Sequence, residues 1–242
     1  MPGAEHDQVA RAMQLADRVS VNLEAPNAPR LEQIAPGKGF DTELMTRLQW
    51  IEELRQHTQD ESGPNRLRAS STTEFVVGPA GERDVELLSA TEYLHKQLKL
   101  ARVYFSAFRP VRDTPLDNFA PTNETRKLRL YQASFLLRDY DFTVEELPFV
   151  ADGDLPQHTD PKCAWAEQHL VHAPIEINTA SERDLKRIPG IGAIYAKRIM
   201  SARRKGTLRN LDDLRALGIH TTKRLTPYVL LAGRSPDQPR LF

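Results

Sequence analysis

The sequence predicts a mixed fold, with an α/β region at the N-terminus followed by an all-α region. In the first half, three short runs that favour strands alternate with helical patterns, which is the order expected of βα units with parallel strands. Toward the C-terminus, helical patterns follow one another with short glycine-containing turns between them. The predicted division is an α/β domain over 1–108, a loop-rich helical connector over 109–174, an all-α domain over 175–234 and a tail over 235–242.

Composition narrows the class of protein. Hydrophobic residues make up 40% of the 242 residues, which is enough for a packed core. No apolar run reaches the roughly 20 residues that a membrane-spanning helix needs, and residues 1–13 lack the apolar segment of a signal peptide. The single cysteine excludes an internal disulfide and suits a reducing compartment. We therefore expect a cytoplasmic protein with no membrane partner.

The first predicted strand, VSVNLE at 19–24, alternates strictly between apolar and polar residues. A helix over 7–18 precedes it, and prolines and glycines over 26–39 break the chain after it. Asp41 is then placed to cap a helix whose apolar face includes Leu44, Leu48 and Ile51. The alternation puts Ser20, Asn22 and Glu24 together on the polar face of the first strand.

The second and third predicted strands are TTEFVVG at 72–78 and ARVYFSAF at 101–108, with a helix over 81–100 between them. Three parallel strands cannot close a barrel and leave two edges open. The predicted architecture is therefore a partial, three-stranded parallel βα half-barrel. We expect another chain to complete the sheet, or the chain to be part of a longer protein.

The connector begins with the proline-rich loop 109–123 and continues with a helix over 123–140, on which Leu128 is expected to face inward. Thr143 and Glu146 have the spacing of a capping box for a short helix. Another short helix is predicted over 163–171.

The C-terminal region contains two copies of a helix–turn–helix unit. In the first copy, a helix capped by Asn178 or Thr179 leads to the turn PGIG at 189–192, and a second helix follows over 193–206. In the second copy, Gly218 takes the place of Gly190, at a period near 28 residues, and His220 replaces the second glycine. Residues 175–234 carry 13 Lys and Arg against 5 Asp and Glu. This basic excess indicates a polyanion as the partner of the region.

The first copy resembles the helix-hairpin-helix family, whose pattern is matched by Leu185, Ile188, Pro189, Gly190, Ile191, Gly192, Ala196 and Ile199. The resemblance implies DNA binding without sequence preference, with backbone N–H groups holding a phosphate. The implied DNA-binding residues are Gly190, Ile191, Gly192 and Ala193 at the hairpin, with Ile191 itself in the core, and the cations Lys197, Arg198, Arg203, Arg204 and Lys205.

One position departs from the family pattern. Many members place Lys, Arg or a small polar residue two positions after the second glycine, whereas this chain has Ile194. A side-chain contact with phosphate is therefore missing there. The alternative reading is that the unit serves only as a packing module.

A second resemblance covers nearly the whole chain. The stretches VSVNLEAP, TTEFVVGPAGE, ARVYFSAFRPV, TRKLRLYQASFLLRDYDF and DPKCAWA resemble, in order, the C-terminal portion of a radical S-adenosylmethionine family assigned to DNA modification or repair. Genes of that family often accompany a uracil-DNA-glycosylase-like protein, which is therefore an implied partner. The complete family member is implied to hold an iron–sulfur cluster and S-adenosylmethionine.

The cluster motif of that family, three cysteines spaced C-x-x-x-C-x-x-C, is absent from this chain, and Cys163 alone cannot hold a cluster. We therefore expect the chain to bind no cofactor by itself and assign it no catalytic residue; a partner chain would have to supply the cluster. Ser20, Asn22 and Glu24 are implied to line a cofactor site, with Gly78 and Ser106 as further candidates at strand ends. The alternative is that these are ordinary polar surface residues.

Two other groups of residues were considered as a metal site and as acid–base groups. His158, Cys163, His169 and His172 lack the paired spacing of a structural zinc site, so no metal is expected. Glu74, Glu82 and Asp84 could be considered as acid–base groups, but nothing except their proximity pairs them. Two functions remain open: the DNA-engaging part of a radical S-adenosylmethionine enzyme, or a non-catalytic DNA-binding protein or truncated remnant that uses the helix-hairpin-helix alone.

Overall fold

A computed structural model describes residues 3–58, 67–220 and 222–236. The chain divides into two compact units, Met1–Ser134 with Phe149–Gln157, and Phe135–Pro148 with His158–Phe242. Residues of the predicted connector 109–174 are shared between both units. None of the helices in the described part of the chain combines the length and apolar character required to cross a membrane.

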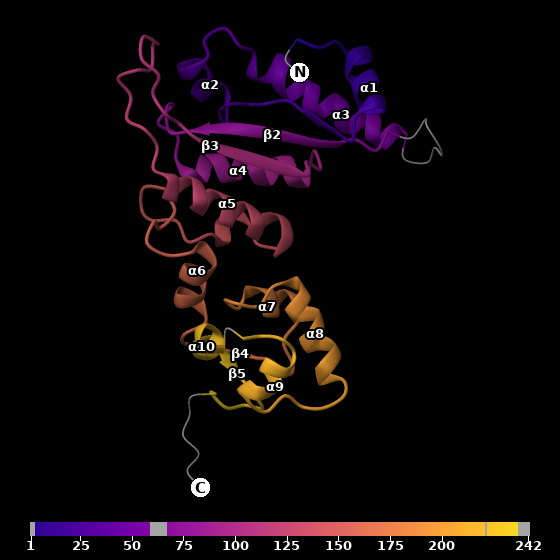
Figure 1. Cartoon of the computed structure of the whole chain (residues 1–242), viewed down its shortest axis with the longest axis vertical. Coiled ribbons are helices and arrows are strands. Elements are labelled where there is room, and N and C mark those ends of the chain that lie inside the picture. Colours follow the sequence, from indigo (N-terminus) through magenta and orange to yellow (C-terminus); the bar gives the residue numbers. More distant parts are fainter. Residues whose placement is uncertain (1–2, 59–66, 221, 237–242) are drawn as a thin grey trace. The chain divides into compact units, whose positions relative to one another are not determined.

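The first unit is built around a parallel sheet with the strand order β1-β2-β3 (Figure 1). The predicted class, with a three-stranded parallel sheet and many helices, is confirmed. The strands are β1 (Arg18–Ser20), β2 (Ser70–Val77) and β3 (Arg102–Ala107); the helices are α1 (His6–Leu15), α2 (Ala28–Ile34), the π-helical turn η1 (Phe40–Met45), α3 (Thr46–His57), α4 (Asp84–Lys96) and the first part of α5 (Glu124–Asp139).

One face of the sheet forms the core of this unit. The side chains that alternate along the strands toward this face are buried, and so are the apolar side chains of the helices: Val21, Leu23, Phe75, Val77, Val103, Phe105, Leu48, Ile51, Leu87, Leu88 and Leu130. On the outer side of β3, the Tyr131 hydroxyl accepts the Phe105 backbone N–H at 3.0 Å, and the two rings meet edge to face. α5 thus provides a hydrogen-bond acceptor for one backbone N–H at the open edge of the sheet.

Local structure departs from the predictions in four places. β1 ends at Ser20. Beyond it the Val21 N–H still donates to the Thr72 carbonyl at 3.2 Å, and Glu24, which has a left-handed φ of 65°, forms an isolated bridge with Phe75. α2 lies within the segment expected to be broken by prolines, because Asn27 caps it and Pro29 occupies its first turn. The next helix starts after Gly39, so Asp41 lies within η1 rather than capping it. Leu128 is 50% exposed, because the buried face of α5 runs through Leu130 instead.

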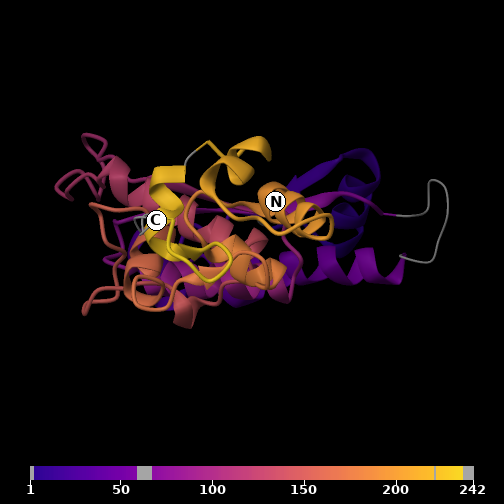
Figure 2. The same ribbon diagram turned by 90° about the horizontal axis from the view of Figure 1, so that it is seen from below.

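The second unit contains the end of α5, the 3-10 turn η3 (Val144–Glu146), α6 (Pro161–His169), β4 (Ile175–Glu176), α7 (Glu182–Arg187), α8 (Ala193–Arg203), α9 (Leu211–Ala216), α10 (Thr222–Leu225), η4 (Thr226–Tyr228) and β5 (Val229–Leu230). In Figure 2 the elements from α7 onward carry the orange and yellow part of the colour scale. The Thr143–Glu146 capping box is confirmed, with the Thr143 N–H bound to the Glu146 carboxylate at 2.9 Å.

Two features of this unit were not predicted. β4 and β5 form a small parallel sheet that joins the start of the repeat to its end. α7 is capped by Ser181, whose Oγ accepts the Asp184 N–H at 3.1 Å, rather than by Asn178 or Thr179. Asn178 instead donates to the Leu208 carbonyl at 2.9 Å.

α7 packs on aromatic residues that precede the repeat in sequence. The Arg187 guanidinium lies over the rings of Phe142 and Trp165, 4.3 and 4.9 Å from their centroids, and pairs with Glu146 at 2.8 Å. Its neighbour Lys186 pairs with Asp141. The helix–turn–helix repeat therefore shares a core with residues 139–146 and α6, and these two cations of α7 contribute to that packing.

Candidate nucleic-acid interface

The first hairpin is a tight turn, and the backbone conformation at position 190 favours glycine. α7 ends at Arg187, and Gly190 then adopts a left-handed φ of 88°, a conformation that costs L-residues energy. The Ile191 N–H bonds to the Ile188 carbonyl at 3.0 Å, and the Ile191 side chain is fully buried. The placement of Ile191 in the core therefore agrees with the prediction, and its N–H is already bonded within the turn.

Gly192 forms the N-cap of α8, in extended backbone conformation. Because glycine has no side chain, no side-chain oxygen caps the helix from this position, and the first-turn N–H groups of α8 have no carbonyl partner within the helix. A Cβ at Gly192 would lie 3.1 Å from the Tyr140 hydroxyl, so the chain approaches closely here. Ala193 and Ile194 are exposed, Ile194 by 67%. The hairpin thus presents a positive helix end at an open surface.

A pocket of about 780 Å³ lies against this hairpin. The turn from Pro189 to Tyr195 forms one side, and the other lining residues come from outside the hairpin: Asp139, Tyr140, Asp160, Lys162, Cys163 and Arg224. The pocket therefore brings together the end of α5, the start of α6, the hairpin and α10. Lys162 and Arg224 were not among the predicted site residues, because neither lies in the first motif.

Lys162 occupies an unusual environment in this pocket. Its ammonium donates to the Ile191 carbonyl at 2.6 Å and lies 4.6 Å from the centroid of the Tyr140 ring. Burial lowers the pKa of Lys162 to about 7, while Asp160 and Cys163 act in the opposite direction. Burial also raises the pKa of the Cys163 thiol and of the Tyr140 hydroxyl.

The predicted cations fall into two groups. Lys197, Arg204 and Lys205 are exposed. Lys197 and Arg204 follow Ala193 by four and eleven residues, which places them along one side of α8. Arg203 instead turns inward and donates to the Ile177 and Ala180 carbonyls at 3.1 and 2.7 Å. Arg198 donates to the Leu217 carbonyl at 3.0 Å and lies over the Tyr195 ring.

The second hairpin repeats the backbone of the first. Gly218 has a φ of 87°, and Ile219 is fully buried like Ile191. A Cβ at Gly218 would lie 2.9 Å from an Arg198 nitrogen, so Arg198 occupies the approach to this turn. The helix that follows, α10, spans only Thr222–Leu225.

The polar face of the sheet in the first unit forms a hydrogen-bonded row across the three strands. The Ser20 hydroxyl donates to Asn22 Oδ1 at 2.8 Å, and Asn22 Nδ2 donates to Glu74 at 3.4 Å. The Ser106 hydroxyl bonds to the other oxygen of Glu74. Burial raises the pKa of Glu24, Lys38 lowers it and Glu74 raises it further. The predicted cofactor residues Ser20 and Asn22 are thus brought together with Glu74 and Ser106.

The other two acidic candidates of the sequence analysis, Glu82 and Asp84, are held by contacts within this unit. Asp84 is fully buried, where it accepts from Arg126 Nε at 2.7 Å and from the Leu155 N–H at 2.9 Å. Glu82 binds the Gly78 N–H through one oxygen, and its other oxygen has no hydrogen-bond partner. Burial raises the pKa of both carboxyls. Gly78, the predicted strand-end candidate, therefore serves as a donor to Glu82.

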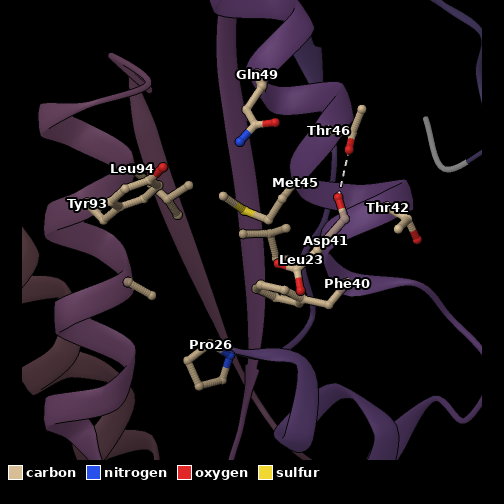
Figure 3. Close-up of a pocket in the computed structure, with 11 residues that line it drawn as sticks. Leu23, Pro26, Phe40, Asp41, Thr42, Met45, Thr46, Gln49, Tyr93 and Leu94 are labelled. Carbon is tan, nitrogen blue, oxygen red and sulfur yellow. Dashed lines mark hydrogen bonds between the residues drawn. The ribbon is translucent and has the colours of Figure 1, made fainter.

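A second pocket, of about 590 Å³, lies between η1 and α4 in the first unit (Figure 3). Its walls are mostly apolar, with Leu23, Phe40, Met45 and Leu94 among the side chains that Figure 3 labels. Ser20, Asn22 and Glu24 are not among its lining residues. This pocket is therefore separate from the predicted cofactor site.

The cysteine and histidines between 158 and 172 do not gather around a common point. His169 stacks on the Trp165 ring, with its Nδ1 2.8 Å from the Trp165 carbonyl oxygen. Within the ranges 3–58, 67–220 and 222–236, no three His, Cys, Asp or Glu side chains are grouped so as to hold a metal ion.

Comparison with known proteins identifies a helix-hairpin-helix motif over residues 172–228. The match spans both hairpins, and this motif supports DNA binding without sequence preference. No curated protein and no solved structure matches the chain. The comparisons therefore support the motif and leave the resemblance to radical S-adenosylmethionine proteins without support.

Proposed function

We propose that this protein binds the sugar–phosphate backbone of DNA through its first hairpin, without reading base sequence. The observation that carries the proposal is the uncapped N-terminus of α8, which follows a glycine turn and opens into a pocket with cationic side chains. N–H groups at such a helix end favour an anion. The exposed Lys197, Arg204 and Lys205 would extend this contact along neighbouring phosphates.

Salt dependence and indifference to sequence are the first test. Fluorescence anisotropy of the whole chain with two unrelated 20-base-pair duplexes should give similar affinities. If three or four phosphates are contacted, raising the salt from about 50 to about 200 mM should weaken binding roughly 40- to 150-fold. A strong preference for one duplex would contradict binding through the backbone alone.

A matched pair of variants tests the position of the site. Ala193→Glu places a carboxylate at the exposed first turn of α8. The negative charge interacts favourably with the helix N-terminus but repels a phosphate. Ala216→Glu adds the same charge at the exposed last residue of α9. We expect Ala193→Glu to weaken DNA binding about tenfold or more and Ala216→Glu less than about threefold, since a surface charge pair contributes little. Equal losses would favour the alternative that the hairpin serves only in packing.

We further propose, on the strength of the second resemblance, that the chain acts with a partner in DNA modification or repair. The polar row of Ser20, Asn22, Glu74 and Ser106 supports this proposal, because it offers donors and acceptors on the sheet face away from the apolar core. With Glu24, these residues would hold S-adenosylmethionine, and a uracil-DNA-glycosylase-like protein is a further proposed partner. The chain itself does not fit an iron–sulfur cluster, since its one cysteine lies in the hairpin pocket.

The cofactor and cluster proposals have separate tests. Iron and sulfide assays on the purified chain should find no stoichiometric cluster; a value near one cluster per chain would contradict this. Equilibrium dialysis with S-adenosylmethionine should show no binding to the chain alone. In the presence of the chain that supplies the cluster, binding should be lost in Asn22→Leu and retained in Gln49→Leu. Gln49 is the matched control because it lines the other pocket.

A further inference from the structure

The hairpin lacks a side-chain cation where its own motif would supply one. Ile194 stands two residues after Gly192 and is 67% exposed, and it can neutralise no charge. The nearest exposed cation of the same helix, Lys197, lies more than a full turn from the N-terminus of α8. A phosphate at the hairpin would therefore need its charge partner from another segment.

The pocket supplies two such partners. Lys162 comes from the first turn of α6, and its ammonium is fixed at the Ile191 carbonyl and against the Tyr140 ring. An ammonium has three donors; one is used by the carbonyl and the ring covers a second side, which leaves a donor for a ligand. Arg224 comes from α10 in the second half of the repeat, lines the same pocket and is exposed.

We propose that Lys162 and Arg224 are the side-chain cations of the hairpin phosphate site, in place of the missing cation at position 194. This inference rests on the proposed DNA binding and names two further binding residues for it. The site would combine backbone donors from the first hairpin, an ammonium from α6 and a guanidinium from α10. Such a site suits a single phosphate group, because Arg and Lys are the side chains that bind phosphate oxygens.

The pocket is lined by two carboxylates as well as by the two cations. The facing groups are Asp160 and Cys163 beside it, Asp139 and Tyr140 at the end of α5, Tyr195 on α8 and Arg224 on α10. Asp160 is engaged with the N–H groups of Lys162 and Cys163, and its negative charge favours protonated Lys162. Asp139 is paired with Arg138 at 2.8 Å. Both carboxylates thus already have partners.

A bound phosphate should couple DNA binding to protonation of Lys162. Its pKa is about 7 in the free protein, and a nearby anion would raise it. Binding would then take up a proton, so affinity should be greatest below pH 7 and should fall as the pH rises above 7. Because histidines also titrate near this range, the test compares variants rather than relying on the wild type alone.

The experiment measures anisotropy of a fluorescein-labelled 20-base-pair duplex with Arg224→Gln, Lys162→Met and the control Lys223→Gln. Lys223 is the exposed neighbour of Arg224 and does not line the pocket. Arg224→Gln should weaken binding about fivefold or more and reduce the salt slope by about 1. Lys223→Gln should change affinity less than about twofold. Lys162→Met should weaken binding and lose the part of the pH dependence between pH 6 and 8.5 that wild type shows.

Thermal melting of each variant shows whether it is folded, and Arg224→Gln keeps the test valid if Lys162→Met does not fold. If wild type binds DNA but Arg224→Gln behaves like Lys223→Gln, the inference is wrong. It is also wrong if folded Lys162→Met keeps the wild-type pH dependence. Failure of wild type to bind any duplex would instead refute the proposed function.

Discussion

The two hairpins share a backbone and differ in what surrounds it. Gly190 and Gly218 have nearly the same φ, 88° and 87°, and the isoleucine after each is fully buried. In each turn a backbone carbonyl is bound by a cation from another segment, Lys162 at Ile191 and Arg198 at Leu217. The turn itself is therefore conserved within the repeat, together with a cation beside it.

The surroundings of the two turns differ in the helix that follows and in access to the pocket. The first turn leads into the 11-residue helix α8 and opens into the pocket. The second leads into the four-residue helix α10, and Arg198 occupies its approach. The first repeat thus has an open helix N-terminus beside the pocket, whereas the second turn packs against Arg198 and its helix contributes Arg224 to the pocket. We therefore expect that a glycine turn alone does not make a binding site.

The largest expected effect concerns the buried isoleucines. Ile191→Ala and Ile219→Ala each remove a fully buried side chain, so each should lower the free energy of unfolding by about 2–5 kcal/mol. Chemical denaturation of both variants measures the two losses. A loss below about 1 kcal/mol in one variant would show that the two turns are not equivalent in the core.

A smaller effect is expected from two neighbouring arginines at the end of α8. Arg203→Met removes the donors to the Ile177 and Ala180 carbonyls and should cost about 1–3 kcal/mol of stability. Arg204→Met removes an exposed charge and should change stability by less than about 0.5 kcal/mol, while weakening DNA binding and its salt dependence. Denaturation and anisotropy on both variants test this; the reverse pattern would place Arg203, rather than Arg204, on the DNA.

The smallest effect is expected when the second hairpin is made to match the first. His220→Gly restores the missing second glycine, yet α10 remains short and Arg198 still occupies the turn. DNA affinity should stay within about twofold of wild type, with a stability loss of about 1 kcal/mol or less. A clear gain in affinity, measured by the same anisotropy assay, would show that the glycine pattern by itself creates a phosphate site.

Much of the fold could be predicted from local sequence patterns. The β-branched and aromatic residues of β2 and β3, the hairpin glycines and the Thr143–Glu146 capping box act over short distances in sequence, and the structure has these elements where they were predicted. β1 was predicted too long: the strand ends at Ser20, and Glu24 forms only an isolated bridge with β2 at a left-handed φ of 65°. α2 was missed because proline was read as a break, although Pro29 stands in the first turn, where proline is tolerated.

Only the backbone of the candidate site, and not its set of side-chain cations, could be predicted from the sequence. Gly190 and Gly192 could be identified because the motif requires their conformation and closeness. Arg203 and Lys197 could not be told apart, since only packing shows that Arg203 reaches two carbonyls of the segment before α7 while Lys197 is exposed. No sequence pattern marks Lys162 as a site residue, because it lies 28 residues before Gly190 in an ordinary helical segment.

The sequence by itself determined the two glycine turns, the three parallel strands and the basic character of the C-terminal region, because each follows from short-range conformational preference or from composition. Only the tertiary structure decided which cations reach the first hairpin, which are used in packing, and that β4 pairs with β5 across more than 50 residues. The reason is physical. Burial and hydrogen-bond partners depend on segments far apart in the chain, and the same side chain can be a ligand for phosphate or for a carbonyl according to which one the fold brings within reach.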